Sequence, residues 1–298
     1  MKNRTQKTLA TISLGLVGAL ALAGCSASSA DETDSKGTVT LGFLPSWTDA
    51  LSMTYLLKDQ FEKRGYTVEL ESLTEAGPLY TGIARGDIDM YPSAWSDVAQ
   101  VSYMEQYADD LEDLGSYYDE GTGVLAVPSY MDDINKISDL RDHADLFDGK
   151  IYTIEPGSGT VDYAERELLP HYGLDENYDL ITSSTPAMLG QLDGAIADKE
   201  NIVVTLWKPF WAISAYDIKL LEDDEQGYEV EGLHFVANKE FSKKYPELAE
   251  MVGEIKLDDE QYGSLEDLVV NEYGEGKEAE AVDAWLEEHS DEFDWVVD

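Results

Sequence analysis

Cysteine and basic residues are scarce in this chain, and each scarcity excludes a class of protein. There is one cysteine among 298 residues, so neither an intrachain disulfide framework nor a multi-cysteine zinc site can form. Twenty basic side chains oppose 62 acidic ones, which gives a formal net charge of −42. A chain this acidic repels nucleic-acid phosphates and anionic lipid headgroups. Its hydrophobic content of 43% is too high for a disordered acidic chain and supplies a core for one large domain or two smaller ones.

Sequence signatures of catalysis are also missing. The chain has no Gly-x-Ser-x-Gly, no His-Glu-x-x-His and no phosphate-binding loop that ends in Gly-Lys-Ser/Thr. The four histidines are scattered along the sequence, which favours structural roles over a metal or catalytic cluster. Carboxylates are so numerous that their spacing does not indicate a glycosidase. We therefore predict that the protein is not an enzyme and that it uses no metal and no cofactor.

The first 24 residues have the pattern of an export signal. Three basic residues precede an apolar run over residues 9–23, which is too short and too rich in small residues for a membrane span. The run ends in Leu22-Ala23-Gly24-Cys25, which resembles the bacterial lipobox, where cleavage exposes a cysteine that then carries lipid. A plain secretory peptide with an incidental cysteine is the alternative. We expect lipid on Cys25 to anchor the protein to the outer face of the cell membrane, with residues 25–36 as a flexible tether.

Strand and helix patterns alternate twice along the exported chain. The first series predicts strands at 38–43, 67–72 and 88–92, with helices at 48–64 and 77–85 between them. The second series predicts strands at 150–154, 178–183 and 202–206, with helices at 161–169 and 186–198 between them. This rhythm is typical of parallel strands joined by helical crossovers. The predicted fold class is α/β with two lobes, each a mainly parallel sheet flanked by helices.

The remaining segments predict where the lobes begin and end. Apolar runs at 124–127 and 233–237 are expected to cross between the lobes, and residues 222–231 to form a polar surface loop. The chain from residue 239 onward is expected to form helices that complete the first lobe. Lobe I then comprises residues 37–128 and 234–298, lobe II comprises 129–233, and a ligand cleft lies between them.

Tryptophan is the most informative residue type. Of the six tryptophans, Trp47, Trp95 and Trp207 each follow or end a predicted strand. Ligands of open parallel sheets bind beyond the carboxyl ends of the strands, so three indoles at such ends can face one crevice. Separate packing of each indole in the core is the alternative. Indole faces attract cations, and a quaternary ammonium suits a box of them because it has no N–H to satisfy and a spread charge.

A glycine turn supplies the complementary element. Residues 155–160, Glu-Pro-Gly-Ser-Gly-Thr, join a predicted strand to a predicted helix. Glycine lets backbone approach a ligand closely, and the N–H groups at a helix start attract a carboxylate. Such turns are common and can be purely structural. Together with an indole box, however, the turn predicts a site for a zwitterion that needs no lysine or arginine.

These segments resemble the glycine betaine/proline betaine substrate-binding proteins of ABC transporters over nearly the whole exported length. The matching stretches are 43–50, 86–89 with 94–95, 156–159, and 203–211. The resemblance implies a type II periplasmic-binding fold that captures a betaine and hands it to ABC permease subunits, and we expect a monomer. In the family a prism of three tryptophans holds the ammonium group, and by position it maps onto Trp47, Trp95 and Trp207. Backbone N–H groups hold the carboxylate, and these map onto Gly159 and Thr160.

Two departures from the family pattern leave the ligand open. Many relatives have a histidine four or five residues after the second tryptophan, where this chain has Ala99 and Gln100. Ser158 stands where one branch of the family has a tryptophan. Glycine betaine is the expected ligand, with proline betaine, choline, carnitine or a sulfonium analogue as alternatives. Ser158, Gln100 and Trp211 are possible accessory residues, although Trp211 is expected to pack rather than to line the cage.

Two other classes of protein remain as alternatives: a surface hydrolase that uses carboxylates, and an adhesive lipoprotein without a small ligand. The acid excess takes no part in the predicted site, which consists of neutral indoles and backbone amides. Cleavage after Gly24 would remove three basic residues and no acidic ones, which leaves a net charge of −45. We interpret this charge as a solvated surface, and adaptation to a salty exterior is a hypothesis.

Overall fold

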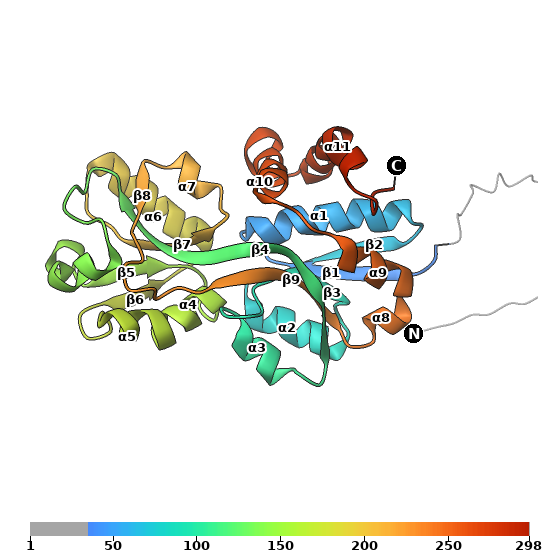
Figure 1. Ribbon diagram of the computed structural model, residues 1–298, viewed down its shortest axis with the longest axis horizontal. Coiled ribbons are helices and arrows are strands. Elements are labelled where there is room, and N and C mark those ends of the chain that lie inside the picture. The colour runs from blue at the N-terminus through green and yellow to red at the C-terminus, as the bar shows by residue number, and fades with distance from the viewer. Residues whose placement is uncertain (1–34, 298) are drawn as a thin grey trace, which may run out of the picture. The chain divides into compact units, whose positions relative to one another are not determined.

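One sheet of nine strands runs through residues 35–297, the part of the chain that the computed structural model describes (Figure 1). The predicted export signal and Cys25 lie outside the described residues. The strands are β1 (Thr38–Phe43), β2 (Thr67–Ser72), β3 (Met90–Ala94), β4 (Leu111–Pro128), β5 (Lys150–Thr153), β6 (Asp179–Thr182), β7 (Val204–Lys208), β8 (Ile218–Leu220) and β9 (Val230–Asn238).

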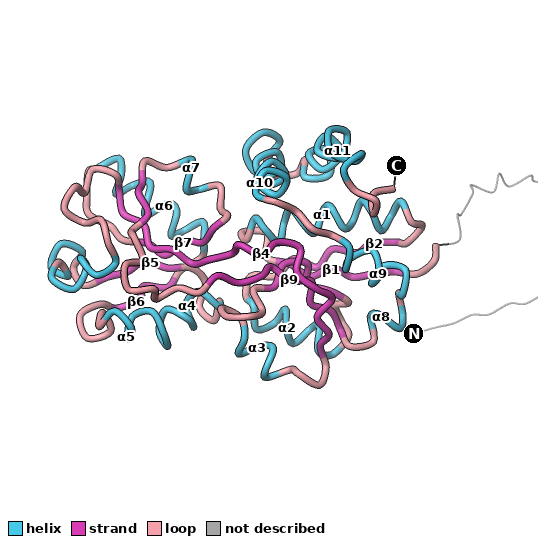
Figure 2. Tube along the Cα trace, in the orientation of Figure 1, coloured by secondary structure: helices cyan, strands magenta, loops and turns pink. Residues whose placement is uncertain are grey.

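Helices cover the sheet, as Figure 2 shows by colour. The α-helices are α1 (Thr48–Lys63), α2 (Ala76–Arg85), α3 (Val101–Gln106), α4 (Gly159–Tyr163), α5 (Leu169–Tyr172), α6 (Thr185–Asp198), α7 (Ala212–Ala215), α8 (Phe241–Lys244), α9 (Pro246–Glu254), α10 (Asp259–Asp267) and α11 (Glu278–His289). Short 3-10 helices span Ile137–Asp142, Ala144–Phe147 and Ser290–Glu292, and π-helical turns span Ala164–Leu168 and Leu268–Tyr273.

The strand order joins two parallel groups into a continuous mixed sheet. The order is β2-β1-β3-β9-β4-β7-β5-β6, with β8 paired to β4. β1 is parallel to β2 and β3, and β5 is parallel to β6 and β7, as the alternating pattern predicted. The pairs β3–β9, β9–β4 and β4–β7 are antiparallel. The long strands β4 and β9 therefore connect the groups, and in Figure 1 they run across the molecule between them.

The larger hydrophobic core lies around β1, β3 and helix α1. Met53, Leu57 and Phe61 recur at helical spacing on α1 and are fully buried. Helices α10 and α11 pack on α1, so the chain after residue 239 does form helices beside the first strand group. The same core continues into α6 and β7, and a smaller core lies around β5, α5 and the first 3-10 helix. The division into lobes at residues 128 and 234 stays a prediction.

Four element predictions were wrong in detail. The third strand is 90–94 rather than 88–92, because residues 86–89 form the turn that leaves α2. The helix expected at 161–169 is a composite of α4, a π-helical turn and α5; Pro170 lacks the N–H that would continue the α ladder there. Strand β4 begins at Leu111, far before the apolar run at 124–127. The earlier part of the strand was not predicted because it is largely polar. Residues 230–231 belong to β9 rather than to a loop.

Candidate functional site

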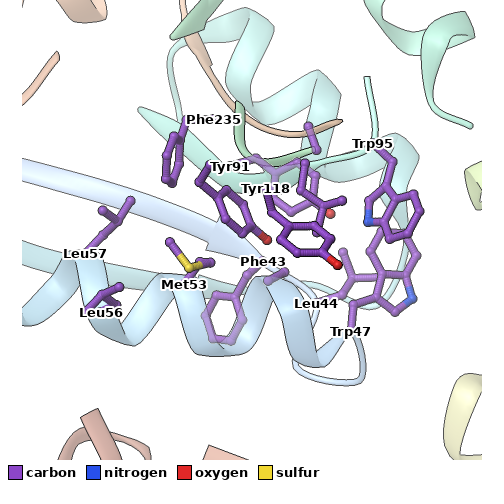
Figure 3. Packing of buried hydrophobic residues seen from close by; sticks show 14 of the residues in the cluster. Phe43, Leu44, Trp47, Met53, Leu56, Leu57, Tyr91, Trp95, Tyr118 and Phe235 are labelled. Carbon is purple, nitrogen blue, oxygen red and sulfur yellow. The ribbon is translucent and has the colours of Figure 1, made fainter. Parts of the chain in front are cut away.

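One cavity brings together the three tryptophans that the sequence singled out. Trp47 follows β1, Trp95 follows β3, and Trp207 lies in β7, yet all three line the same cavity. The indoles are almost closed off from solvent, with exposed fractions of 5%, 9% and 5%. Figure 3 shows Trp47 and Trp95 at one end of the core, beyond the start of α1 and away from Leu56 and Leu57.

Buried carboxylates hold two of these indoles by their N–H edges. Trp95 Nε1 donates to Asp49 Oδ2 at 3.1 Å, and Ser93 Oγ donates to the same oxygen at 2.6 Å. Trp47 Nε1 donates to Glu155 Oε2 at 3.1 Å. A hydrogen bond at the edge fixes the ring while its face remains available for contact. Asp49 was not among the expected site residues, although it stands two positions after Trp47.

The third indole is held by stacking. Trp207 stacks on Phe210 with ring centroids 3.9 Å apart and planes at 24°. Within residues 35–297 its buried Nε1 has no hydrogen-bond partner. Its β-sheet neighbour across from it is Gly123 on β4, where a Cβ would lie 2.3 Å from the ring of Tyr228. Glycine at this position therefore lets the tyrosine ring lie close to β4.

Two tyrosines complete the aromatic wall. Tyr163 and Tyr228 line the cavity and stack on each other, with centroids 5.9 Å apart and planes at 18°. The Tyr163 hydroxyl donates to the backbone oxygen of Gly227 at 2.6 Å. Neither ring was predicted from the sequence. Tyr228 lies in the segment that was interpreted as a polar surface loop. No local motif marks either residue.

The glycine turn also forms part of the cavity wall. Ser158, Gly159 and Thr160 all line the cavity, and Ser158 caps α4 by accepting the N–H of Val161 at 3.3 Å. The N–H groups of Gly159 and Thr160 are in the first turn of the helix, which offers them no backbone carbonyl. They lie at the positive end of the helix, which favours an anion.

Close backbone approach brings this turn against the segment after β3. A Cβ on Gly159 would lie 2.5 Å from the backbone oxygen of Ala99 and 2.8 Å from Cγ of Gln100. Gln100 lines the cavity, and its Oε1 accepts the Tyr80 hydroxyl at 2.8 Å and the backbone N–H of Trp95 at 3.0 Å. The amide oxygen is thus occupied, which leaves the NH₂ group as the part of Gln100 that can serve a ligand.

Three carboxylates also line the cavity, namely Asp49, Glu229 and Glu231. Burial raises the pKa of Asp49 above its ordinary value and that of Glu231 to about 7. Glu231 accepts the N–H groups of Val98 at 2.9 Å and Ala99 at 3.0 Å. None of the described residues that line the cavity is a lysine, arginine or histidine. The cavity wall therefore carries acidic groups beside the neutral indoles and backbone amides of the predicted site.

The remaining tryptophans lie elsewhere. Trp211 does not line this cavity; it meets Phe210 edge-on at 5.7 Å and borders a separate apolar cavity. Trp285 is fully buried and donates to the backbone oxygen of Gln261 and to Ser264 Oγ. Trp295 is also buried in the larger core. These three indoles pack outside the cavity, as the sequence predicted for Trp211.

Two features are absent from residues 35–297. In that part of the chain, no group of three or more histidine, cysteine, aspartate or glutamate side chains is arranged to hold a metal ion. Of the helices that the structure describes, none combines the length and the apolar character that crossing a membrane requires.

Comparison with known proteins identifies the family. Residues 37–288 match the model of the substrate-binding domain of ABC-type glycine betaine transport systems. The chain belongs to this family. It is therefore a substrate-binding protein of a transporter rather than an enzyme, and its fold is the two-lobed type II periplasmic-binding fold with a cleft between the lobes.

Individual relatives support the assignment. The chain is 32% identical to the glycine/betaine/L-proline-binding protein ProX of Borrelia burgdorferi, whose crystal structure aligns with a TM-score of 0.75 over 85% of this chain and 94% of that one. It is 23% identical to the glycine betaine-binding periplasmic protein OusX of Dickeya dadantii over 99% of this chain and 98% of that protein. The match to the glycine betaine/carnitine transport binding protein GbuC of Listeria monocytogenes is 28% identical and spans about half of each protein, 51% and 50%. OusX is a periplasmic protein by its description.

Proposed function

We propose that this chain captures a quaternary-ammonium solute, with glycine betaine as the first candidate, and delivers it to an ABC permease. The ammonium group would lie between the indoles of Trp47, Trp95 and Trp207, and the carboxylate would accept the N–H groups of Gly159 and Thr160. The observation that carries the proposal is that one cavity is lined both by three indoles and by a helix start whose Gly159 and Thr160 N–H groups have no backbone acceptor within the helix. Each desolvated cation–indole contact contributes about 2 kcal/mol.

The cavity also supports closure around the ligand. Trp47 and Trp95 follow strands of one parallel group, and Trp207 and Gly159 belong to the other. With lobe I at residues 37–128 and 234–298 and lobe II at 129–233, the ligand would contact both lobes. Its contacts with each lobe would stabilise the closed arrangement, which the permease could then recognise. Ser158 and the NH₂ group of Gln100 would contribute accessory polar contacts.

Choline is a second candidate because of the carboxylates. A zwitterion brings its own negative charge toward Asp49 and Glu231, whereas choline brings only a positive one. One solved structure of this fold is a choline-binding protein in complex with choline, at 20% identity and a TM-score of 0.75. The wall of this cavity therefore suits a cation at least as well as a betaine.

Calorimetric titration with glycine betaine, proline betaine, carnitine and choline tests the proposal. We expect saturable binding of at least one of them, and the tightest ligand decides between betaine and choline. Trp95→Ala should weaken binding by roughly 30-fold for the loss of about 2 kcal/mol. Trp211→Ala, which removes an indole outside the cavity, is the matched control and should bind like the wild type. Absence of binding by all four compounds would refute the proposed function.

Attachment of the protein to the membrane is part of the same proposal. Lipid on Cys25 would hold the monomeric binding protein beside its permease, and residues 25–36 would give it reach. The only cysteine directly follows the apolar run of the export signal, which supports this. In cells, Cys25→Ser should move the protein from the detergent-soluble membrane fraction to the soluble fraction. An unchanged distribution would refute the anchor and leave ligand binding unaffected.

A further inference from the structure

A buried glutamate behind the cavity joins parts of the chain that no strand pairing connects. Glu155 follows β5, has an exposed fraction of 6%, and does not line the tryptophan cavity. Trp47, one of its partners, follows β1. In the sheet, β3, β9, β4 and β7 lie between β1 and β5, so the contact bridges strands that are not neighbours.

The carboxylate of Glu155 accepts four hydrogen bonds, two on each oxygen. Oε1 accepts the backbone N–H of Thr185 at 2.8 Å and the Ser46 hydroxyl at 3.2 Å. Oε2 accepts Trp47 Nε1 at 3.1 Å and the Thr185 hydroxyl at 2.9 Å. Because a carboxylate is an acceptor at both oxygens, it satisfies every one of these donors. No neutral side chain of the same size can do so.

A second set of contacts holds the other flank of the same turn. The Tyr103 hydroxyl, beyond β3, donates to the backbone oxygen of Gly157 at 2.6 Å. Gly159 packs against the backbone of Ala99, which is possible because glycine has no Cβ. Residues 155–159 are thus held by contacts with the loop after β1 and with the segment after β3.

We propose that Glu155 is a positioning residue of the ligand site. It fixes the edge of the Trp47 indole and holds the loop after β1 against the turn that carries Gly159 and Thr160. The two parts of the site, indole face and helix start, then keep one spacing. This inference rests on the proposed function, since it takes the tryptophan cavity as the ligand site.

The substitution Glu155→Gln isolates this role. The Trp47 indole N–H and the Thr185 backbone N–H can only donate, and each lies on a different oxygen. An amide has one oxygen, so in either orientation its NH₂ group faces one of these two donors. The hydroxyls of Ser46 and Thr185 can rotate and accept instead. The volume is nearly unchanged. The substitution removes one negative charge and one acceptor, which leaves one of these two N–H groups unpaired.

Two measurements on the full exported chain test the proposal. In ¹⁵N-indole NMR spectra, with and without glycine betaine or choline, the Trp47 N–H resonance should shift in E155Q and exchange faster with water. The exposed Glu275→Gln variant, with the same charge change, should leave it in place. By calorimetry, E155Q should raise Kd tenfold or more, which equals 1.4 kcal/mol. In a Trp47→Phe background, which lacks the indole N–H, the same substitution should raise Kd less than threefold.

The outcomes separate the positioning role from the proposed function. An unchanged Trp47 resonance in E155Q, in both the free and the ligand-bound protein, overturns the positioning role. An equal loss of affinity in the wild-type and Trp47→Phe backgrounds also overturns it, because Glu155 would then act without Trp47. If the wild type binds neither compound, the proposed function fails, while the NMR spectra of the free protein still decide whether Glu155 positions Trp47.

Discussion

Replacing Gly159 by alanine adds one methyl group where the candidate site has a close backbone approach. The Cβ would lie 2.5 Å from the backbone oxygen of Ala99, 2.6 Å from its carbonyl carbon and 2.8 Å from Cγ of Gln100. Favourable carbon contacts begin near about 3.5 Å, so the turn or the segment after β3 must move by roughly 1 Å. Two of the three contacts are to backbone, which cannot turn aside as a side-chain tip can.

The expected magnitude follows from this geometry. Overpacking of this kind costs about 1–3 kcal/mol, which corresponds to an increase in Kd of roughly 5- to 150-fold. The contact joins the turn before α4 to the segment after β3, so we expect the strain to arise on closure around ligand. Without ligand, the unfolding temperature should then stay within about 2 °C of the wild type, which limits the lost stability to about 1 kcal/mol.

The assay pairs calorimetric titration of glycine betaine and choline with thermal unfolding of the free protein. Gly194→Ala is the control, because a Cβ there has no atom within 4 Å and lies on helix α6. Alanine in that helix should leave Kd unchanged and raise stability by up to about 1 kcal/mol. Wild-type affinity in Gly159→Ala would refute the close approach as a requirement for binding.

Three further predictions concern pH and salt. Burial raises the pKa values of Glu231 and Glu266 to about 7, so the folded state binds protons on these groups more tightly than the unfolded state. The unfolding free energy should therefore fall as pH rises from about 4.5 to 7, by up to about 3 kcal/mol for each group. Denaturant titrations that give the same unfolding free energy across this range would contradict the prediction. A cation in the cavity favours ionised Glu231, so choline should bind more tightly as pH rises through 7. The affinity should increase by up to tenfold for each unit by which bound choline lowers the pKa of Glu231. In Glu231→Gln, calorimetry should show an affinity that depends less on pH. Salt screens repulsion among 62 acidic side chains, so the unfolding temperature should rise between low and molar salt, and a flat response would count against a salt-adapted surface.

Local patterns were enough to predict most of the strands and helices. Helical spacing of apolar residues and short β-branched runs depend on neighbours within a few positions, and those neighbours are written in the sequence. Most of strand β4 was not predicted, because residues 111–123 are largely polar and glycine-rich and are stabilised by pairing with β9 rather than by a pattern of their own. The joining of two parallel groups into one sheet has the same origin, since it depends on antiparallel pairs far apart in sequence.

Among site residues, those with a local signature were found and those without one were not. Trp47 and Trp95 follow strands, Trp207 lies near the end of one, and Gly159 starts a helix after a glycine turn, so each is recognisable from its local sequence. Asp49, Tyr228 and Glu231 carry no such mark, and only the tertiary structure places them in the cavity wall.

The sequence by itself determined the α/β fold class, the absence of a disulfide framework, and the residues that resemble a betaine cage. Only the tertiary structure decided that Trp211 lies outside the cavity, that acidic groups line it, and that Glu155 bridges strands β1 and β5. The physical reason is range: propensity and capping act within a turn or two of helix. A buried carboxylate, by contrast, takes its partners from any segment that the fold brings within 3 Å or so.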